Sequence, residues 1–351
     1  MPRLPAPLTL PDAARDRRTG GQDPGDPADP ADPAAGGRSR LPGFLRRPGG
    51  SPLRRGESVT AWAFIAPAVL IILGLSIVPV GWSFLLSFQA DDLVTPSRWV
   101  GLDNYRALRL DPHFGQAVRN TLLYTALYVP LSIGLGLALA LVLNRRIRFV
   151  GLYRTLIFVP FVISATAQGV LFSFILDPEF GAANSVLHTL GISPQGFLSD
   201  PGQALLVLVA ISLWSGTGFC VVVHLAALQD VEPSLIEAAR LDGAGRWHLL
   251  RHVKLPALTP VSVFLLVWQT LNALQVFDLV YVTTKGGPLG STTVIVYFIW
   301  EQAFKNFTAG YGAAAAYVLA VALGVVTVGM RLVRRRSARS VRPVPVEGAG
   351  T

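Results

Sequence analysis

Long apolar runs recur along this chain from Trp62 onward, and polar or glycine- and proline-rich stretches separate them. The pattern predicts six membrane-spanning helices, over residues 62–88, 120–143, 155–176, 204–228, 259–282 and 311–330. A helix of about 20 residues crosses the ~30 Å hydrocarbon core of a bilayer, so each run is long enough. None contains Lys, Arg, Asp or Glu except the fifth, which carries Asp278 near its end. Because a charge in lipid is costly, this is the pattern of an all-α membrane protein with six transmembrane helices.

One further apolar stretch, residues 292–304, is too short to cross a bilayer. A seventh crossing would also place the Arg-rich C-terminus on the opposite side of the membrane from the other basic segments. We therefore predict a short interfacial or partly re-entrant helix for this stretch.

The basic residues predict the orientation. The N-terminal tail 1–57, the loops 144–154 and 229–258 and the C-terminal segment after residue 330 hold 24 of the 30 Lys and Arg residues. Because positively charged loops stay on the cytoplasmic side, both termini are predicted to be cytoplasmic in a multi-pass protein of the bacterial cytoplasmic membrane. The tail 1–57 is rich in Pro, Gly and Asp and is predicted to be disordered. The transmembrane domain is predicted over 58–335, followed by a basic tail, 336–351.

Composition narrows the class further. Hydrophobic residues make up 51% of the chain and charged residues 15%, with a mean hydropathy of +0.48. These values exclude an ordinary soluble enzyme. The net charge of +9 would suggest nucleic acid in a soluble protein, but here the basic loops account for it, and no nucleic acid partner is expected. A single cysteine, Cys220, excludes an internal disulfide and a multi-cysteine metal site, and we predict no metal site.

The chain has no sequence signature of an energy source. None of its three lysines is followed by Ser or Thr, so the phosphate-binding G-x-x-x-x-G-K-[ST] loop is absent. Within the predicted spans only His224 and Asp278 could belong to a proton relay, and a lone His in an apolar helix is more often packed. His248 and His252 lack the Glu of an H-E-x-x-H zinc motif and are interpreted as surface residues. Energy for active transport must therefore come from a partner.

The loop 229–258, between the fourth and fifth spans, has the pattern of two short helices joined by a turn. Pro233 suits the first turn of a helix, where its missing N–H costs nothing. Gly243 and Gly245 then predict a tight turn, because glycine readily takes positive φ. A second short helix is predicted over about 246–253. Two such helices form a compact projection that suits docking into a partner's groove.

The motif residues of this loop are Glu237, Ala238, Ala239, then Asp242, Gly243, Ala244, then Leu255, Pro256 and Pro260. They resemble the EAA loop of bacterial ABC importer permeases, a coupling helix that fits into a cleft of the ATP-hydrolysing subunit. The resemblance implies that ATPase coupling rests on Glu237, Ala238, Ala239, Asp242, Gly243 and Pro256. Ser234 and Glu237 also have the spacing of a helix capping box, a local role that is compatible with docking.

Two other stretches resemble the sugar and glycerol-3-phosphate branch of these permeases, on the side related to the larger permease of the maltose system. They are Trp99–Tyr105 before the second span and Thr284–Pro288, with Thr292 and Thr293, after the fifth. The family often has Gly where Lys285 stands, so this chain departs from the pattern there. The resemblance covers about residues 60–335.

The resemblance implies one subunit of a five-part importer. Its partners are an ABC ATPase dimer, a second permease that is expected to be a different chain, an extracytoplasmic solute-binding protein, a carbohydrate solute and membrane lipid. ATP and Mg²⁺ would be bound by the ATPase, so no cofactor is expected in this chain. The permease itself is not an enzyme.

Polar side chains in two spans are candidates for solute contact. Ser212, Ser215, Gly216 and Phe219 share one face of the fourth span, and Gln269 and Asn272 share a face of the fifth. Hydroxyl groups and an aromatic ring suit a sugar, and in the family solute contacts come from these two spans. Small and polar residues also hold membrane helices together, so packing is the competing interpretation. An ABC permease for another small solute and a passive channel remain alternatives for the function.

Overall fold

The computed structural model describes residues 53–92, 94–145 and 148–340; most of the predicted tail 1–57 and the end of the C-terminal tail lie outside these residues. The chain divides into two units, 1–64 and 65–351, and the described part of the first is the beginning of α1 (Leu53–Ile72). In the structure α1 begins at Leu53, within the last residues of the predicted tail. The last proline of the tail is Pro52, so no proline interrupts a helix over 53–57.

Five helices of the described residues are long and apolar enough to cross a membrane, and the number rises to six when one bent pair of helices is counted as a single span. The five are Thr60–Leu86, Pro112–Leu143, Ala204–Gln229, Arg246–Val282 and Ala309–Leu332. The first comprises most of α1, a π-helical turn η1 (Leu73–Ile77) and α2 (Val78–Leu86), while α4 (Pro112–Leu143), α8 (Ala204–Gln229) and α14 (Ala309–Ser340) contain the second, third and fifth. The six predicted crossings therefore correspond to five helices and one bent pair.

The third predicted span, 155–176, is not one straight helix. It consists of α5 (Val150–Val162) and α6 (Ala165–Ile175), which meet at a 98° bend. Ser164 begins α6 as its N-cap and accepts a bond from the Ala167 N–H. The Gln168 amide donates to the carbonyl oxygens of Pro160 and Ile163, at 3.1 and 2.7 Å, and so satisfies acceptors that the break frees. Apolar composition predicted the crossing but carried no sign of the bend.

The predicted short helix 246–253 is not separate from the fifth span. In the structure α10 (Arg246–Leu249), a π-helical turn η3 (Leu250–Lys254) and α11 (Leu255–Leu274) follow one another without a break, and α12 (Asp278–Val282) comes after a short interruption. The Leu255 N–H bonds to the Leu250 carbonyl, five residues back. This π-helical turn immediately precedes Pro256, which has no N–H to donate, and lets the helix continue past the proline.

At the ends of the helices that lie away from the 229–258 loop, the segment between α2 and α3 is short and is held by backbone and side-chain hydrogen bonds. Strands β1 (Gln89–Ala90) and β2 (Arg98–Trp99) form a two-stranded antiparallel sheet, with Gln89 opposite Trp99, and α3 (Asp103–Leu110) follows. The Asn104 amide donates to the carbonyls of Ser87 and Gln89, both at 2.9 Å. The motif Trp99–Tyr105 therefore anchors the end of the first span to α3.

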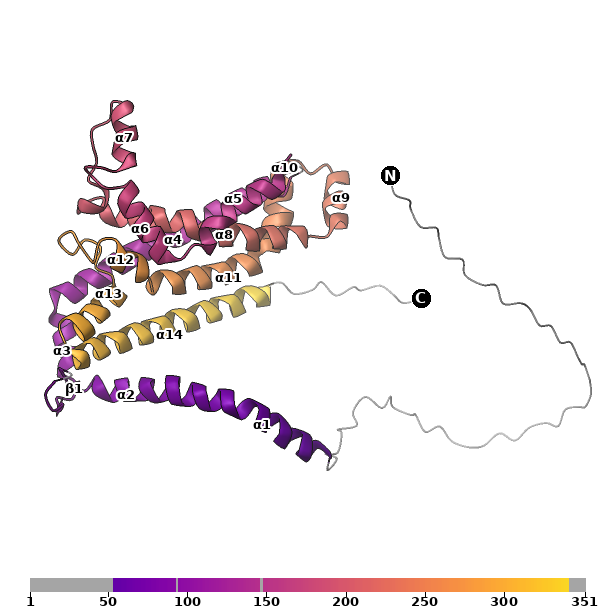
Figure 1. The fold of residues 1–351 in the computed structure, drawn as a ribbon. Coiled ribbons are helices and arrows are strands. Elements are labelled where there is room, and N and C mark those ends of the chain that lie inside the picture. Colours follow the sequence, from indigo (N-terminus) through magenta and orange to yellow (C-terminus); the bar gives the residue numbers. More distant parts are fainter. Residues whose placement is uncertain (1–52, 93, 146–147, 341–351) are drawn as a thin grey trace, which may run out of the picture. The chain divides into compact units, whose positions relative to one another are not determined.

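The remaining helices on this side are α7 (Ala182–Thr189), the 3₁₀ turn η2 (Phe197–Ser199), α13 (Ile295–Trp300) and the π-helical turn η4 (Glu301–Lys305). The short helix predicted within 292–304 is thus present as α13 and η4, and its Tyr297 and Phe298 are buried. We call this side the hairpin end, after β1 and β2. The other side, with α9 (Pro233–Leu241), α10 and the end of α8, is the α9 end (Figure 1).

Buried apolar residues form three clusters along the helices. One, near the hairpin end, joins α3, α4, α13 and α14 through residues such as Leu108 and Phe298. A central one includes Tyr124, Tyr128 and Leu208. The third, toward the α9 end, joins α4, α8 and α11 through Leu143, Leu225 and Leu258. Helix α4 packs against α8 along much of its length, and this packing positions the polar residues that are described below.

The loop 284–293 is held by its own hydroxyl groups and by α4. The Thr293 hydroxyl donates to the Gly286 carbonyl at 3.1 Å, and the Asn120 amide donates to the carbonyls of Gly290 and Thr293 at 2.9 and 3.0 Å. Lys285 has a φ of +51°, the left-handed region that favours glycine. The one position where this chain departs from the family motif is therefore a position where glycine fits the backbone better.

We expect Lys285→Gly to raise the melting temperature of the purified protein in detergent by a few degrees. Lys285 is exposed, and a non-glycine residue in the left-handed region costs about 1–2 kcal/mol. Gly286→Ala is the matched control, because Gly286 also has positive φ and a Cβ there would lie 2.8 Å from the Thr293 hydroxyl oxygen. That variant should melt earlier. A lower melting temperature for Lys285→Gly would contradict the backbone argument.

Candidate functional site

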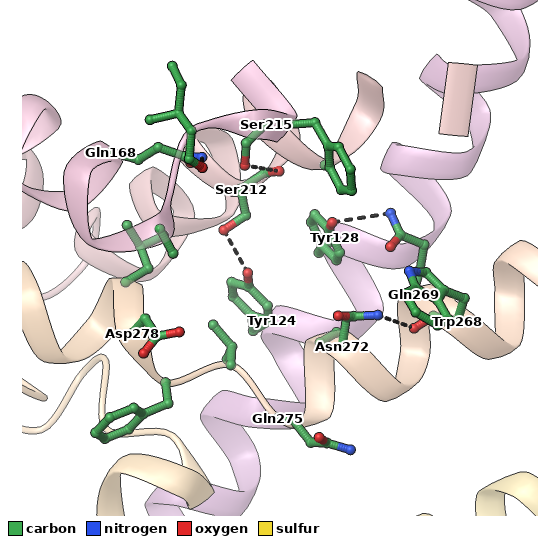
Figure 2. Close-up of a pocket in the computed structure, with 18 residues that line it drawn as sticks. Tyr124, Tyr128, Gln168, Ser212, Ser215, Trp268, Gln269, Asn272, Gln275 and Asp278 are labelled. Atoms are coloured by element: carbon green, nitrogen blue, oxygen red, sulfur yellow. Dashed lines mark hydrogen bonds between the residues drawn. The ribbon is translucent and has the colours of Figure 1, made fainter. Parts of the chain in front are cut away.

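A cavity of about 400 Å³ opens among α4, α8, α11 and the bent pair α5–α6 (Figure 2). Its walls are partly aromatic, with the rings of Phe161, Trp268 and Phe277. The polar side chains that line it are Tyr124, Tyr128, Gln168, Ser212, Ser215, Gln269, Asn272, Gln275 and Asp278. Helices far apart in the sequence thus bring hydroxyl and amide groups together within a set of apolar helices.

Five of the six residues predicted from the fourth and fifth spans line this cavity: Ser212, Ser215, Gly216, Gln269 and Asn272. The sixth, Phe219, does not line it. Its ring stacks on Phe161, with centroids 5.3 Å apart, and lies 5.8 Å from the Trp268 ring. Trp268 is 45% exposed and lines the cavity.

Two tyrosines of α4 complete the cavity, and sequence reasoning missed both. The Tyr124 hydroxyl donates to the Ser212 hydroxyl at 2.7 Å, and the Tyr124 and Tyr128 rings stack with centroids 5.7 Å apart. Their spacing of four residues, which places them on one face of the second predicted span, was the signal that could have found them. Gln168, the only amide side chain in the third predicted span, was also missed.

Gly216 is a glycine because of its close contact with Tyr128. A Cβ atom at residue 216 would clash with the hydroxyl of Tyr128, so the tyrosine already occupies the space beside this glycine. Glycine is therefore required here for α4 to approach α8 closely, with the tyrosine hydroxyl at the cavity wall.

Gln269 and Asn272 share a helix face but differ in their surroundings. Gln269 is 3% exposed, and its amide nitrogen lies 3.1 Å from the Tyr128 hydroxyl and 3.2 Å from the Cys220 sulfur. It therefore joins α4, α8 and α11. Asn272 is exposed, and its amide donates only to the backbone carbonyl of Trp268 at 2.8 Å. Within the part of the chain that the structure describes, no hydrogen bond is formed to its side-chain oxygen.

The cavity has one formal charge. Asp278, at the start of α12, is the only Asp, Glu, Lys, Arg or His among the residues that line it. Aromatic rings with hydroxyl and amide groups between them suit a polyhydroxylated solute, whose ring has apolar faces and polar edges. A lone carboxylate at the wall disfavours a solute that carries negative charge.

The loop at the α9 end begins and ends as its sequence suggests. Helix α9 starts at Pro233 with Glu232 as its N-cap, and the Glu232 side chain makes no capping bond. The capping-box interpretation of Ser234 is wrong, because Ser234 already lies inside the helix. At the other end Gly243 has a φ of +81°, and its N–H bonds to the Arg240 carbonyl at 3.0 Å while the Ala244 N–H bonds to the Ala239 carbonyl at 2.9 Å. This is a Schellman motif, which ends the helix at one defined residue.

The motif residues of this loop are largely exposed. Glu237, Ala238, Asp242, Gly243 and Pro256 are exposed, and Ala239 is half-buried. Leu241 is 89% exposed and Trp247 is 70% exposed. A recess of about 670 Å³ lies between α9, α10 and the end of α4, and Ile236, Arg240 and Trp247 line it. Large apolar side chains that protrude beside basic ones are typical of a protein docking surface.

The histidines have structural surroundings. His224 is fully buried, with Nδ1 2.9 Å from the Cys220 carbonyl oxygen and Nε2 3.3 Å from the Ser262 hydroxyl, so it packs between α8 and α11 as expected of a lone histidine. His248 and His252 are exposed and stack with ring centroids 4.0 Å apart. Among the described residues no group of three or more His, Cys, Asp or Glu could hold a metal ion.

Membrane-crossing helices around a polar cavity, with an exposed helical loop at one end, define the class: the membrane-spanning subunit of a transporter. The family model for the binding-protein-dependent transport system inner membrane component matches residues 132–342. The chain is 35% identical over 283 residues to the lactose transport system permease protein LacF of Rhizobium radiobacter, which covers 79% of this chain and 94% of that protein. It is 33% identical over 278 residues to the probable ABC transporter permease protein YesP of Bacillus subtilis, over 78% of this chain and 89% of that one.

The fold is similar to that of a solved bacterial ABC transporter involved in the import of the acidic polysaccharide alginate. The TM-score is 0.74 at 24% identity, over 81% of this chain and 98% of that one. The chain belongs to the family of binding-protein-dependent transport system inner membrane components. It is a permease subunit of an ABC importer and a multi-pass protein of the inner membrane. ATP hydrolysis in this family belongs to a separate subunit, and a solute-binding protein and a second permease are its other partners.

Proposed function

We propose that this permease carries a sugar or sugar-like solute across the cytoplasmic membrane. The observation that supports this best is the cavity among α4, α8 and α11, where hydroxyl, amide and aromatic groups lie together around one carboxylate. The similarity to a lactose permease supports the same solute class. Asp278, the single formal charge of the cavity wall, favours a neutral solute over an anionic one.

Within this site the roles of the predicted residues differ. Asn272 and Ser215 contact the solute, because Asn272 is exposed in the cavity and the Ser215 hydroxyl donates only to its own helix, at 3.3 Å to the Ser212 carbonyl. Ser212, Gly216 and Gln269 hold Tyr124 and Tyr128 in place, because each of them contacts one of the two hydroxyls. Phe219 closes the cavity at the side toward the α9 end.

The α9 end faces the cytoplasm in this proposal, and both termini lie there. The described part of this end carries Arg145, Arg148, Arg240, Arg246, Arg251 and Lys254, which is the charge pattern of a cytoplasmic surface. The transmembrane domain is taken to be 58–335, with basic residues beyond it.

Helix α9 docks on the ATPase, which binds ATP and Mg²⁺. The exposed Glu237, Ala238, Asp242 and Gly243, with Pro256 behind them, form the contact surface, and Leu241 supplies an apolar anchor. A rigid α9 with a defined end transmits the movement of the ATPases into α11 because η3 and α11 continue directly from α10. A solute can shift this equilibrium only through its different affinities for the two states.

The test is ATP-driven uptake of a radiolabelled disaccharide into proteoliposomes that contain both permeases, the ATPase and the binding protein. We expect Glu237→Lys to abolish uptake while the protein remains inserted, because a positive charge replaces a carboxylate on the docking face. Glu179→Lys is the matched control: the same charge change lies at the hairpin end, where Glu179 is exposed, and uptake should be retained. Normal uptake by Glu237→Lys would refute the docking role, and no disaccharide uptake by the parent complex would refute the solute class.

A further inference from the structure

The recess of about 670 Å³ at the α9 end is lined by several basic side chains. The end of α4, helix α9 and the segment from α10 to η3 enclose it. Its basic residues are Arg145, Arg240, Arg246 and Lys254, and no Asp or Glu is among the described residues that line it. The rest of its wall is mostly apolar, and it shares no residue with the cavity among α4, α8 and α11.

The basic side chains of the recess are not neutralised by carboxylates of the described chain. None of the four takes part in a salt bridge with a described residue, and the ion pairs Asp103–Arg106 and Glu301–Lys305 lie at the hairpin end. Lys254 is half-buried, whereas the three arginines are exposed. Like charges that share a small recess repel one another, and an anion bound among them removes this repulsion.

Helix α9 presents different faces to the recess and to the proposed ATPase contact. Ile236 and Arg240, four residues apart, line the recess. Glu237, Ala238 and Leu241 of the proposed docking surface do not line it. Successive residues of a helix are about 100° apart, so these three are turned away from the face of Ile236 and Arg240. The recess is therefore distinct from the surface that we place against the ATPase.

The recess lies at the depth of the lipid headgroups. The membrane-spanning helix α4 ends at Leu143, and Arg145 follows two residues later, about 3 Å farther along. Lys254 lies in the first turns of the span Arg246–Val282. The headgroup region extends about 5–8 Å beyond the hydrocarbon on each side of a bilayer. Trp247, which is 70% exposed, is also of the residue type that is enriched at this interface.

An apolar strip continues from the recess along α4 toward the middle of the membrane. Gly134, Ala138 and Leu141 precede Arg145 at steps of four, three and four, which keep residues on one face of a helix. Gly134 and Ala138 are exposed, and a Cβ added at Gly134 would meet no atom within 4 Å. We call Gly134, Ala138 and Leu141 the α4 strip. Its surface is open at the depth where acyl chains lie.

We propose that the recess binds the phosphate group of an anionic phospholipid, such as phosphatidylglycerol, and that an acyl chain of this lipid lies along the α4 strip. Guanidinium groups donate paired hydrogen bonds to phosphate oxygens, and the Lys254 ammonium adds a point charge. A lipid fits better than a soluble anion because the basic recess continues into an apolar surface at membrane depth.

The bound lipid connects Arg145 at the end of α4 with Arg240 of α9 and Lys254 of η3. It thereby links the helix that we place against the ATPase to the membrane. The assignment of this lipid to the cytoplasmic leaflet rests on the orientation given in the proposed function, whereas the binding itself does not.

Binding is tested by native mass spectrometry of the complete importer, delipidated in detergent, with added dioleoylphosphatidylglycerol or dioleoylphosphatidylcholine. The parent should prefer phosphatidylglycerol. One basic residue near an anionic lipid surface is worth about fivefold in affinity, so the double variant Arg240→Gln, Lys254→Gln should weaken this binding about tenfold or more. One tightly bound phosphatidylglycerol should then be lost for each copy of this chain. The double variant Arg148→Gln, Arg251→Gln is the matched control, because it removes the same charge from exposed residues that do not line the recess, and it should keep the preference.

The α4 strip is tested without a change of charge. Ala138→Trp should weaken the binding of phosphatidylglycerol because the indole ring covers the strip. Ala126→Trp, at an exposed position of the same helix about three turns away, should not. Co-purification of the ATPase with each variant shows that the complex is assembled.

Three results would overturn the proposal. The first is equal binding of phosphatidylglycerol by the parent and the double variant of the recess. The second is displacement of the lipid by inorganic phosphate at an ionic strength at which sodium chloride has no effect, which would assign the recess to a soluble anion. The third is loss of the ATPase from that double variant with unchanged lipid binding, which would assign the recess to an acidic surface of the ATPase. None of these measurements uses a transported solute, so they test the lipid site even if the solute is not a sugar.

Discussion

Gly243→Pro is expected to reduce ATP-driven uptake to the background level while the protein is still inserted into the membrane. Gly243 has a φ of +81°, which the proline ring cannot adopt, and its N–H donates to the Arg240 carbonyl. Proline would therefore remove both the left-handed residue and one of the two bonds of the Schellman motif that ends α9. The helix that we place in the ATPase cleft would lose its defined end and its direction into α10.

Gly245→Pro is the control for this prediction. Gly245 has a φ of −70°, close to the value that proline imposes, and it stands as the N-cap of α10. The same substitution two residues away should leave a measurable part of uptake. We would measure uptake in proteoliposomes, insertion by membrane fractionation, and ATPase association by co-purification. Equal uptake by the two variants would show that the shape of the turn is not needed for coupling.

Gln269→Ala and Asn272→Ala are expected to impair the importer in different ways. Gln269 is buried, and its loss leaves the hydroxyls of Tyr128 and Ser132 and the Cys220 sulfur without their shared donor. Unsatisfied buried groups cost about 1–3 kcal/mol, so this variant should melt several degrees earlier and lose solute affinity as well. Asn272 is exposed in the cavity, so Asn272→Ala should keep the parent's melting temperature. Loss of one hydrogen bond to the solute should raise the half-saturation concentration by about tenfold.

The discriminating measurement is the pair of values, melting temperature and half-saturation concentration, for each variant. ATPase co-purification should be unchanged in both, because neither residue lies near α9. If Gln269→Ala melts like the parent and changes only affinity, Gln269 is a solute contact rather than a positioning residue. If neither variant changes affinity, the cavity among α4, α8 and α11 is not where the solute binds.

The hydrophobic periodicity and the charge distribution predicted which residues share a helix face, but they did not predict which of these residues face the cavity. The position of Asn272 and Gln269 on one face followed from helical spacing, and so did the row from Ser212 to Phe219. Which of them faces open space did not follow, because that depends on α4, whose Tyr124 and Tyr128 reach across to α8. The bend between α5 and α6 was also invisible, since an apolar run reads the same whether the helix is straight or broken.

The sequence by itself determined that this chain is a membrane permease. The length of the apolar runs and their lack of charged residues predict the crossings, and the distribution of arginine predicts their direction. The glycine and proline positions of the 229–258 loop predict a helix with a defined end. These are local properties, because a bilayer imposes its thickness and polarity on each segment separately. Only the tertiary structure decided which polar side chains meet, that Tyr128 rather than a solute fills the space beside Gly216, and that Phe161, Phe219 and Trp268 form one contact. Those contacts join residues from three or four helices, and the packing that brings the helices together has no signal in any one of them.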